Sequence, residues 1–233
     1  MASGKGILLG ALGGLLLRDT TVRAVRDVAE HFRAVELVGP GLRGVDFHPG
    51  DKVQVLLPSR DVRTYTPLRW DSEAGATELL VYHHTDSPAG AWIRGLAEGD
   101  ACRFVGPQRS LRRAGSGPAV LFGDETSCAA AHAFAAADPE LALVLETSHE
   151  ADVARALGDL AAHATLVPRS ADESHLARVL DALQSRLERP GAALYLTGRA
   201  QAIQGVRAGL KARALASPTA TRAYWSLGKR GLD

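Results

Sequence analysis

Short apolar runs separated by turn residues fill the first half of the chain. Between Val53 and Leu57 apolar and polar residues alternate, as in a strand with one buried face. Glycine-containing turns such as residues 39–41 and 98–100 separate the runs. The predicted strands are residues 22–28, 32–38, 52–57, 79–82 and 101–105. Short strands at fairly regular spacing predict a closed antiparallel barrel or a sandwich.

The second half has a different period. Apolar strands at residues 119–122, 141–145, 165–167 and 193–196 alternate with helical patterns. The helical patterns are residues 127–137, a run with Val153, Leu157 and Leu160, a run from Leu176 to Leu187, and a run with Ile203, Val206 and Leu210. This alternation predicts a parallel sheet covered on both faces.

The two periods meet at a basic, glycine-containing stretch, residues 112–117. We therefore predict a domain of residues 19–113 followed by a second of residues 118–233. Residues 6–17 form an apolar run between Lys5 and Arg18 that is too short to span a bilayer. We expect a leader helix over residues 1–18 that packs on the protein, with a secretion signal as the alternative.

Bulk properties narrow the class of protein. The 233 residues include 46% hydrophobic and 23% charged ones, which is typical of a globular protein. A formal net charge of +1 and the lack of a polybasic run give no reason to expect nucleic acid or a membrane surface as partner. Two cysteines, Cys102 and Cys128, provide no disulfide framework, so we expect a cytoplasmic protein.

Residues 63–66 (RTYT) carry the most distinctive chemistry. Arg63 offers a planar fork for phosphate oxygens, and in an extended segment Tyr65 projects to the same side. A phosphate-bearing ligand with a flat ring suits both. Alone, the stretch is also compatible with an ordinary polar strand end, but residues 84–92 (HTDSPAGAW) and 106–107 (GP) follow it in the same half.

The second half opens with a strand-to-helix turn, Gly123 to Ser127. A helix start at the carboxyl end of a parallel strand is suited to phosphates. Asp124 and Thr126 are equally suited to capping the helix, and from the turn alone the cap is favoured. At a similar turn, Arg199 either faces a phosphate or is an ordinary surface arginine.

Several other site types lack their motifs. The eight histidines have no metal-ligand spacing, so no metal site is expected, and no Gly-x-Ser-x-Gly or Gly-x-Gly-x-x-Gly motif is present. The end of the chain combines Trp225 with Lys229 and Arg230. It is either a last strand with Trp225 in the core, or it brings an aromatic ring and positive charge to a ligand.

Together these motifs resemble one family. The segments that carry the resemblance are residues 63–67 (RTYTP), His84, Pro88–Ala89 and Trp92, residues 104–107 (FVGP), residues 123–126 (GDET), and residues 224–225 with 228–229. Their order is similar to that in siderophore-interacting proteins, FAD-dependent ferric-siderophore reductases of the ferredoxin–NADP reductase superfamily. The resemblance runs from about Val22 to the end. It implies an α+β two-domain fold, in which an antiparallel Greek-key β-barrel binds FAD and an α/β parallel-sheet domain binds nicotinamide nucleotide.

The resemblance also implies roles for individual residues. Arg63 would meet the FAD diphosphate, Tyr65 would flank the isoalloxazine, and Thr66 would hydrogen-bond the flavin ring. The loop with His84, Thr85, Pro88, Ala89 and Trp92 would contact the phosphates and the adenosine. Pro107 would border the cofactor, and Trp225 is a further cofactor contact. Asp124, Thr126 and Ser127 would serve the NAD(P)H side.

The implied reaction passes electrons from NAD(P)H, or from ferredoxin, through FAD to a ferric siderophore, which then releases Fe(II). Arg199, Lys229 and Arg230 are the candidate cations for an anionic chelate, and no protein metal ligand is needed. Two departures bear on these roles: Arg199 stands where relatives often have an acidic residue, and Ser87 stands where the family loop usually has Gly. The alternatives are a general NAD(P)H-dependent flavin or ferric-chelate reductase, and a flavin- or siderophore-binding protein without reductase activity.

Overall fold

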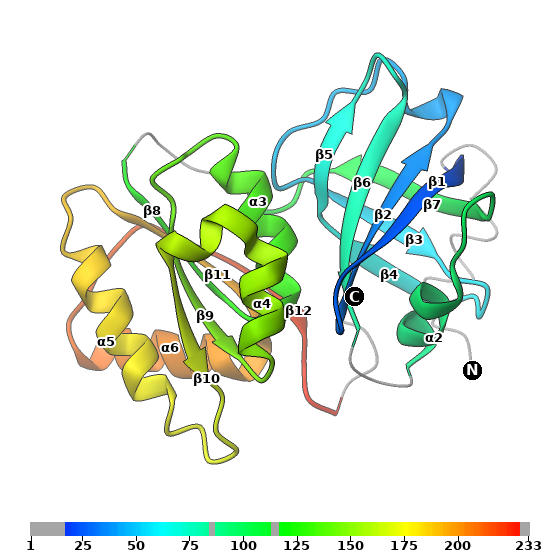
Figure 1. Cartoon of the computed structure of the whole chain (residues 1–233). Coiled ribbons are helices and arrows are strands. Elements are labelled where there is room, and N and C mark those ends of the chain that lie inside the picture. Colours follow the sequence, from blue (N-terminus) through cyan, green and yellow to red (C-terminus); the bar gives the residue numbers. More distant parts are fainter. Residues whose placement is uncertain (1–16, 84–86, 113–116, 229–233) are drawn as a thin grey trace. The chain divides into compact units, whose positions relative to one another are not determined.

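The computed structural model describes residues 17–83, 87–112 and 117–228. The chain divides into two compact units, with the boundary between Arg112 and Arg113 (Figure 1). Most of the predicted leader helix lies outside the described residues. Leu17 and Arg18, its last two residues, instead begin the first strand, β1 (Leu17–Ala29).

The first unit is a seven-stranded antiparallel sheet in the order β4-β3-β7-β1-β2-β6-β5. Besides β1, its strands are β2 (Phe32–Val38), β3 (Lys52–Leu56), β4 (Val62–Tyr65), β5 (Pro67–Asp71), β6 (Ala76–Tyr82) and β7 (Ala101–Gln108), with a 3-10 turn η1 (Pro40–Leu42). The outermost strands β4 and β5 are joined by Thr66 alone, so the sheet curls until its two ends meet. Of the two architectures that the alternating pattern predicts, a barrel or a sandwich, this is the barrel.

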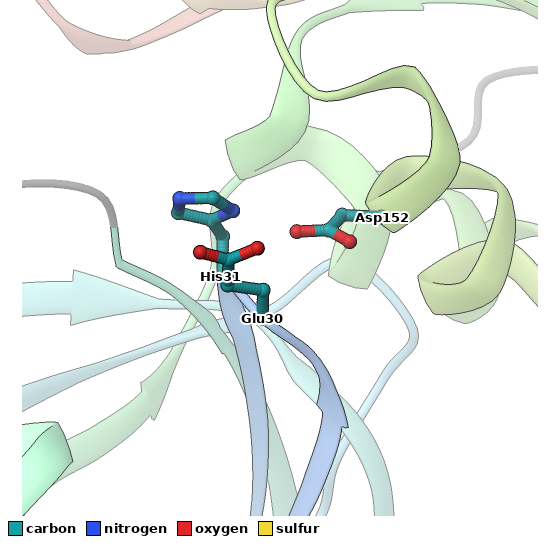
Figure 2. A group of neighbouring side chains, drawn as sticks. All are labelled: Glu30, His31 and Asp152. Carbon is teal, nitrogen blue, oxygen red and sulfur yellow. The ribbon is translucent and has the colours of Figure 1, made fainter.

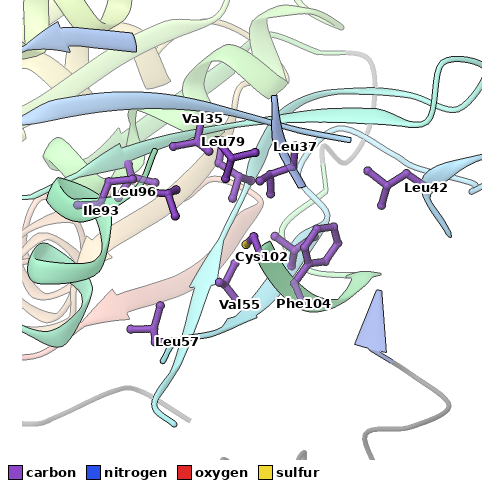
Figure 3. Close-up of a cluster of buried hydrophobic side chains, with 13 residues drawn as sticks. Val35, Leu37, Leu42, Val55, Leu57, Leu79, Ile93, Leu96, Cys102 and Phe104 are labelled. Atoms are coloured by element: carbon purple, nitrogen blue, oxygen red, sulfur yellow. The ribbon is translucent and has the colours of Figure 1, made fainter. Parts of the chain in front are cut away.

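The inward-facing residues of these strands form one core. Val53 and Val55 are fully buried while Gln54 between them is not, which confirms the predicted alternation. The 13 buried residues of the core come from β1, β2, β3, β6 and β7 and from segments beside them (Figure 3): Val22, Val35, Leu37, Leu42, Val53, Val55, Leu57, Leu79, Val81, Ile93, Leu96, Cys102 and Phe104.

One short helix lies in the first unit, where a loop is expected from the sequence. Helix α2 (Pro88–Gly95) begins after Ser87, whose hydroxyl accepts a hydrogen bond from the N–H of Gly90 at 3.1 Å. Pro88 occupies the first helical position, where its missing N–H costs nothing and its fixed φ favours the helix. Ile93 is fully buried and anchors α2 on the barrel core.

The second unit is a parallel sheet in the order β10-β9-β8-β11-β12, as the strand–helix alternation predicts. Its strands are β8 (Ala119–Gly123), β9 (Ala142–Thr147), β10 (Ala164–Pro168), β11 (Ala193–Arg199) and β12 (Thr219–Trp225). Its helices are η2 (Glu125–Ser127), α3 (Cys128–Ala135), α4 (Glu150–Leu157), η3 (Gly158–His163), α5 (Leu176–Leu187) and α6 (Ala200–Ala212). Leu160, expected on the face of one continuous helix, lies in η3 instead.

Both faces of this sheet are covered by helices (Figure 1). Val120 and Phe122 of β8 pack in a core with residues of α5 and α6, such as Val179 and Val206. On the other face, Phe134 of α3 lies edge-on against Tyr195 of β11, with ring centroids 5.0 Å apart. The uninterrupted apolar strands follow from this two-sided burial. No described helix is long and apolar enough to cross a membrane.

Candidate functional site

The RTYT stretch lies on an outer strand of the barrel. Arg63 and Tyr65 belong to β4, which pairs with β3 and is the last strand in the sheet order. Thr66 directly follows, at the point where the chain passes from β4 to β5. An outer strand has backbone N–H and C=O groups that no neighbouring strand uses. The stretch therefore offers a ligand both backbone and side-chain groups.

Arg63 has most of its hydrogen-bonding capacity left. Its side chain is half-buried, and Nη1 donates to the carbonyl of Val62 at 2.9 Å. Among the described residues the guanidinium has no other hydrogen bond and no carboxylate partner. A guanidinium has five N–H donors in a rigid fork, so four remain for the oxygens of a phosphate or diphosphate.

Aromatic side chains lie beside this cation. The rings of Tyr65 and Trp92 have centroids 6.1 Å apart and are tilted by 32°. Tyr65, Ala89 and Trp92 all pack against the barrel core. Burial raises the pKa of the Tyr65 phenol above its usual value, which keeps its O–H protonated as a hydrogen-bond donor. The structure thus brings Tyr65 together with Ala89 and Trp92, which follow it by 24 positions or more in the sequence.

The remaining predicted FAD contacts of the first unit are less completely described. Pro88 is exposed at the start of α2, and Pro107 is half-buried in β7, which pairs with β3. His84 and Thr85 lie outside the described residues. The predicted phosphate loop of residues 84–92 is in part the first turn of α2. Pro88 has no N–H, and the N–H groups of Gly90 and Ala91 donate to Ser87, so among the described contacts of this turn the Ala89 N–H is the one left for an anion. A cation with free donors, a protonated phenol, a ring pair and a helix start fit the diphosphate and flat ring of FAD.

In the second unit, the turn after β8 is a helix cap. The Asp124 carboxylate accepts from the N–H of Thr126 at 2.9 Å, and the Ser127 hydroxyl accepts from the N–H of Asp124 at 3.2 Å. Asp124 and Ser127 are fully buried. The capping interpretation is therefore confirmed, and it leaves little of these two side chains for a nucleotide to contact.

Asp124 also fixes Trp225. The indole Nε1–H of Trp225, at the end of β12, donates to Asp124 at 2.7 Å. Gly198 makes room for the carboxyl group, because a Cβ at its φ of +85° would lie 2.6 Å from the Asp124 Cγ. Burial raises the pKa of Asp124 to about 6, although the Thr126 and Trp225 hydrogen bonds oppose that shift. Trp225 is half-buried on the predicted last strand.

A second set of charged residues gathers at the carboxyl ends of the same strands. We call Glu125, Glu146, Arg169, Glu173, His175 and Arg199 the strand-end ion network. Arg199 contacts Glu146 at 3.1 Å through Nε and Glu173 at 2.5 and 2.6 Å through its two Nη atoms. Arg199 is only 2% exposed. The prediction that it presents free positive charge to a chelate or phosphate is wrong, because two carboxylates already neutralise it.

Arg169 extends the network to β8. Its Nη2 donates to Glu125 at 2.8 Å, Nη1 donates to the Ser148 hydroxyl at 3.0 Å, and Nε lies 3.4 Å from Glu146. Glu125 also accepts from the N–H of Ser148 at 2.6 Å. The network therefore ties the ends of β8, β9, β10 and β11 to one another.

His175 completes the network as a neutral ring. Its Nδ1 accepts from the N–H of Ser170 at 3.2 Å, so the ring proton lies on Nε2, which donates to Glu146 at 2.7 Å. Glu146, Glu173 and His175 are of metal-ligating types and lie together. Arg199 and Arg169 already occupy the carboxylates, so the cluster is an ion-pair network rather than a cation cage. Sequence spacing missed it, although charged residues at successive strand ends were a usable signal.

Two of the predicted cations and one further group of charged side chains remain. Lys229 and Arg230 lie outside the described residues. Figure 2 labels Glu30 and His31, which form the turn between β1 and β2, and Asp152 of α4. The first two belong to one unit and Asp152 to the other, so they do not form a metal site of either unit.

Comparison with known proteins agrees with the resemblance. A family model, the siderophore-interacting FAD-binding domain, matches residues 59–111, which include β4, α2 and β7. This match confirms the resemblance seen in the motifs. No curated protein sequence matches the chain.

Solved structures match over almost the whole chain. A siderophore utilization protein from T. fusca is 22% identical with a TM-score of 0.74, covering 93% of this chain and 95% of that one. The siderophore-interacting protein SipS from Aeromonas hydrophila is 24% identical with a TM-score of 0.75, covering 92% and 93%. Phthalate dioxygenase reductase is 14% identical with a TM-score of 0.75, covering 94% and 71%. At these identities the matches confirm the α+β two-domain fold.

Proposed function

We propose that this protein is an FAD-dependent reductase that passes electrons from NAD(P)H, or from ferredoxin, to a ferric siderophore, from which Fe(II) is then released. The observation that carries the proposal is the Arg63–Tyr65–Trp92 arrangement on β4 and α2, within the span matched by the siderophore-interacting FAD-binding domain. Phthalate dioxygenase reductase, whose structure is described as transferring electrons from pyridine nucleotides, supports the donor.

The first unit would hold the cofactor through several kinds of contact. Arg63 would bind the diphosphate with its free N–H donors, and Tyr65 with Trp92 would provide an apolar wall for the flat ring. Thr66 and the unpaired edge of β4 would orient the ring by hydrogen bonds. The first turn of α2 would supply the N–H of Ala89, with Ser87 holding that turn in place. When bound, FAD supplies the conversion of a two-electron hydride into single electrons for ferric ion.

A general ferric-chelate reductase is the second candidate, and the burial of Arg199 favours it. An anionic siderophore would be attracted by exposed positive charge, but Arg199 is enclosed by Glu146 and Glu173. This leaves Lys229 and Arg230 as the proposed cations for the chelate.

Absorption spectroscopy tests the cofactor first. The purified protein should be yellow, or should take up added FAD and become so; a colourless protein that takes up no FAD overturns the proposal. Anaerobic addition of NADH, NADPH or reduced ferredoxin should then bleach the flavin band. If no donor bleaches it, the protein binds flavin without being a reductase.

The acceptor is tested on the reduced protein. Ferric siderophore should restore the oxidised spectrum while an Fe(II) chelator develops its colour. Equal rates with ferric citrate and with several siderophores would favour the general ferric-chelate reductase, whereas a strong preference for one siderophore class supports the first proposal.

A further inference from the structure

The strand-end ion network lies where a nucleotide is held in an open parallel sheet. Ligands of such sheets bind at the carboxyl ends of the strands, at the point where the strand order reverses. Here β8 is central, with β9 and β10 on one side and β11 and β12 on the other. The reversal therefore falls between β8 and β11. Glu125 begins η2 two residues after β8 and Arg199 ends β11, so the network flanks that point on both strands.

NADH and NADPH differ by one group, the 2′-phosphate on the adenosine ribose. NADPH-binding sites of this kind usually hold that phosphate with an arginine, whereas NADH-binding sites place a carboxylate near the 2′-hydroxyl. The discriminating question is whether a strand-end arginine is available for the phosphate.

Both arginines at the strand ends are committed to carboxylates. Arg199 is 2% exposed and contacts Glu146 and Glu173, while Arg169 contacts Glu125 and Glu146. Arg169 is also held by the Ser148 hydroxyl at 3.0 Å. With His175 neutral, three carboxylates face two guanidinium groups, so the network has an excess of one negative charge.

Residues 170–178 adjoin the network, and their other charged side chains do not cancel its excess negative charge. Asp172 is exposed, and hydrogen bonds from Ser174 and Ser170 lower its pKa to about 2, so it is ionised. Arg178 at the start of α5 is the exposed cation of this segment, and its Nη2 donates to the Pro168 carbonyl at 3.2 Å. The segment thus adds one negative and one positive charge.

We propose that the strand-end ion network makes this protein select NADH over NADPH, with Glu125 acting as the specificity determinant because it holds Arg169 away from a 2′-phosphate. The inference rests on the proposed function for the identity of the donor class. It concerns residues of the second unit alone and predicts binding as well as electron transfer.

Binding of the oxidised nucleotides tests it without any redox step. Calorimetric titration of the flavin-loaded protein should give a Kd for NADP⁺ at least roughly tenfold weaker than for NAD⁺, about 1.4 kcal/mol of discrimination. Equal binding, or tighter binding of NADP⁺, overturns the inference. Failure of both nucleotides to bind also overturns it, while flavin absorption reports separately on the cofactor site.

Glu125→Gln tests the residue. The amide oxygen of Gln still accepts from the Ser148 N–H, but the charge that holds Arg169 is removed. We expect the ratio of NADP⁺ to NAD⁺ affinity to rise roughly tenfold, with the gain abolished in the double variant Glu125→Gln/Arg169→Ala. An unchanged ratio in a folded Glu125→Gln protein removes Glu125 from this role.

Two further variants keep the test decisive. Glu140→Gln removes a carboxylate that pairs with Arg189 at 3.2 Å on the surface of the same unit, and should leave the ratio unchanged. If Glu125→Gln does not fold, Glu173→Gln is measured in its place. The Glu173 side chain is 41% exposed, so the substitution should be tolerated, and removing its charge frees part of Arg199. Selective binding of NAD⁺ without flavin reduction by NADH, NADPH or reduced ferredoxin would support this inference and overturn the reductase proposal.

Discussion

Two arginines, one in each unit, have opposite surroundings. In the first unit, Arg63 is half-buried with one hydrogen bond to a neighbouring carbonyl and no carboxylate partner among the described residues. In the second unit, Arg199 is buried between Glu146 and Glu173. A guanidinium without a partner is available for a ligand, whereas a neutralised one holds the protein together. Arg63 is therefore the proposed ligand contact, whereas Arg199 has a structural role.

The largest expected effect on the free energy of unfolding comes from removing Arg199. Arg199→Ala would leave Glu146, which is 1% exposed, without its main counter-charge. Removing one partner of a buried ion pair costs about 3–5 kcal/mol of unfolding free energy. Urea unfolding followed by circular dichroism measures it.

Arg189→Ala is the matched control for Arg199→Ala. Arg189 pairs with Glu140 on the surface, with side chains 49% and 77% exposed, so its loss should cost less than about 1 kcal/mol. Equal losses in the two variants would mean that the strand-end ion network does not stabilise the second unit.

Asp124 gives a test by pH. Burial raises its folded pKa to about 6 from an unfolded value of 3.8. The folded state therefore binds the proton more tightly than the unfolded state does. The resulting stabilisation is fully present below the unfolded pKa and is lost as pH rises through the folded one, by about 3 kcal/mol at most.

The measurement compares the wild type with Asp124→Asn, which cannot titrate. Their difference in unfolding free energy should change between about pH 4 and pH 7 and be constant outside that window. Asp159→Asn, on the exposed η3 turn, serves as the control. A wild-type minus Asp124→Asn difference that is flat across pH 4–7 would contradict the shifted pKa.

Arg63 should matter for the cofactor rather than for stability. Arg63→Ala removes a charged hydrogen-bond donor from the FAD diphosphate, at a cost of roughly 1.5–3 kcal/mol in binding. Its unfolding free energy should change by less than about 0.5 kcal/mol, because no carboxylate loses a partner. FAD retention on dialysis and a fluorescence titration measure the first effect, and Arg103→Ala, an exposed cation on β7, is the control. Unchanged retention in Arg63→Ala would exclude it from the site.

Sequence patterns predicted the architecture well because it follows from short-range periodicity. The two-residue alternation at Val53 to Leu57 and the helical spacing at Val179 and Leu183 each reflect one buried face. Helix α2 was missed because proline and two glycines in eight residues are typical of a loop. The Ser87–Pro88 pair, a cap followed by the first helical position, was the signal for it.

The strand-end ion network was missed for a different reason. Glu146 and Arg199 are 53 positions apart, and only the parallel order of the strands brings their ends together. A lone arginine after a strand therefore looked like a free cation. In contrast, the RTYT stretch could be proposed from the sequence because its residues are consecutive, with Arg63 to Tyr65 on β4 and Thr66 directly after it.

The smallest effect concerns the start of α2, where the first unit relies on a local contact instead of distant charges. Ser87→Ala removes the acceptor for the Gly90 N–H and should cost about 1 kcal/mol of unfolding free energy. Because the first turn of α2 is proposed to contact FAD, FAD retention should also weaken in Ser87→Ala. The loss should be smaller than in Arg63→Ala, since a backbone turn that loses its cap still has its N–H groups. Ser87→Thr keeps the hydroxyl and should restore both properties. If Ser87→Ala lowers stability while FAD retention stays at the wild-type level, α2 supports the barrel but does not contact the cofactor, and the phosphate contacts then rest on Arg63.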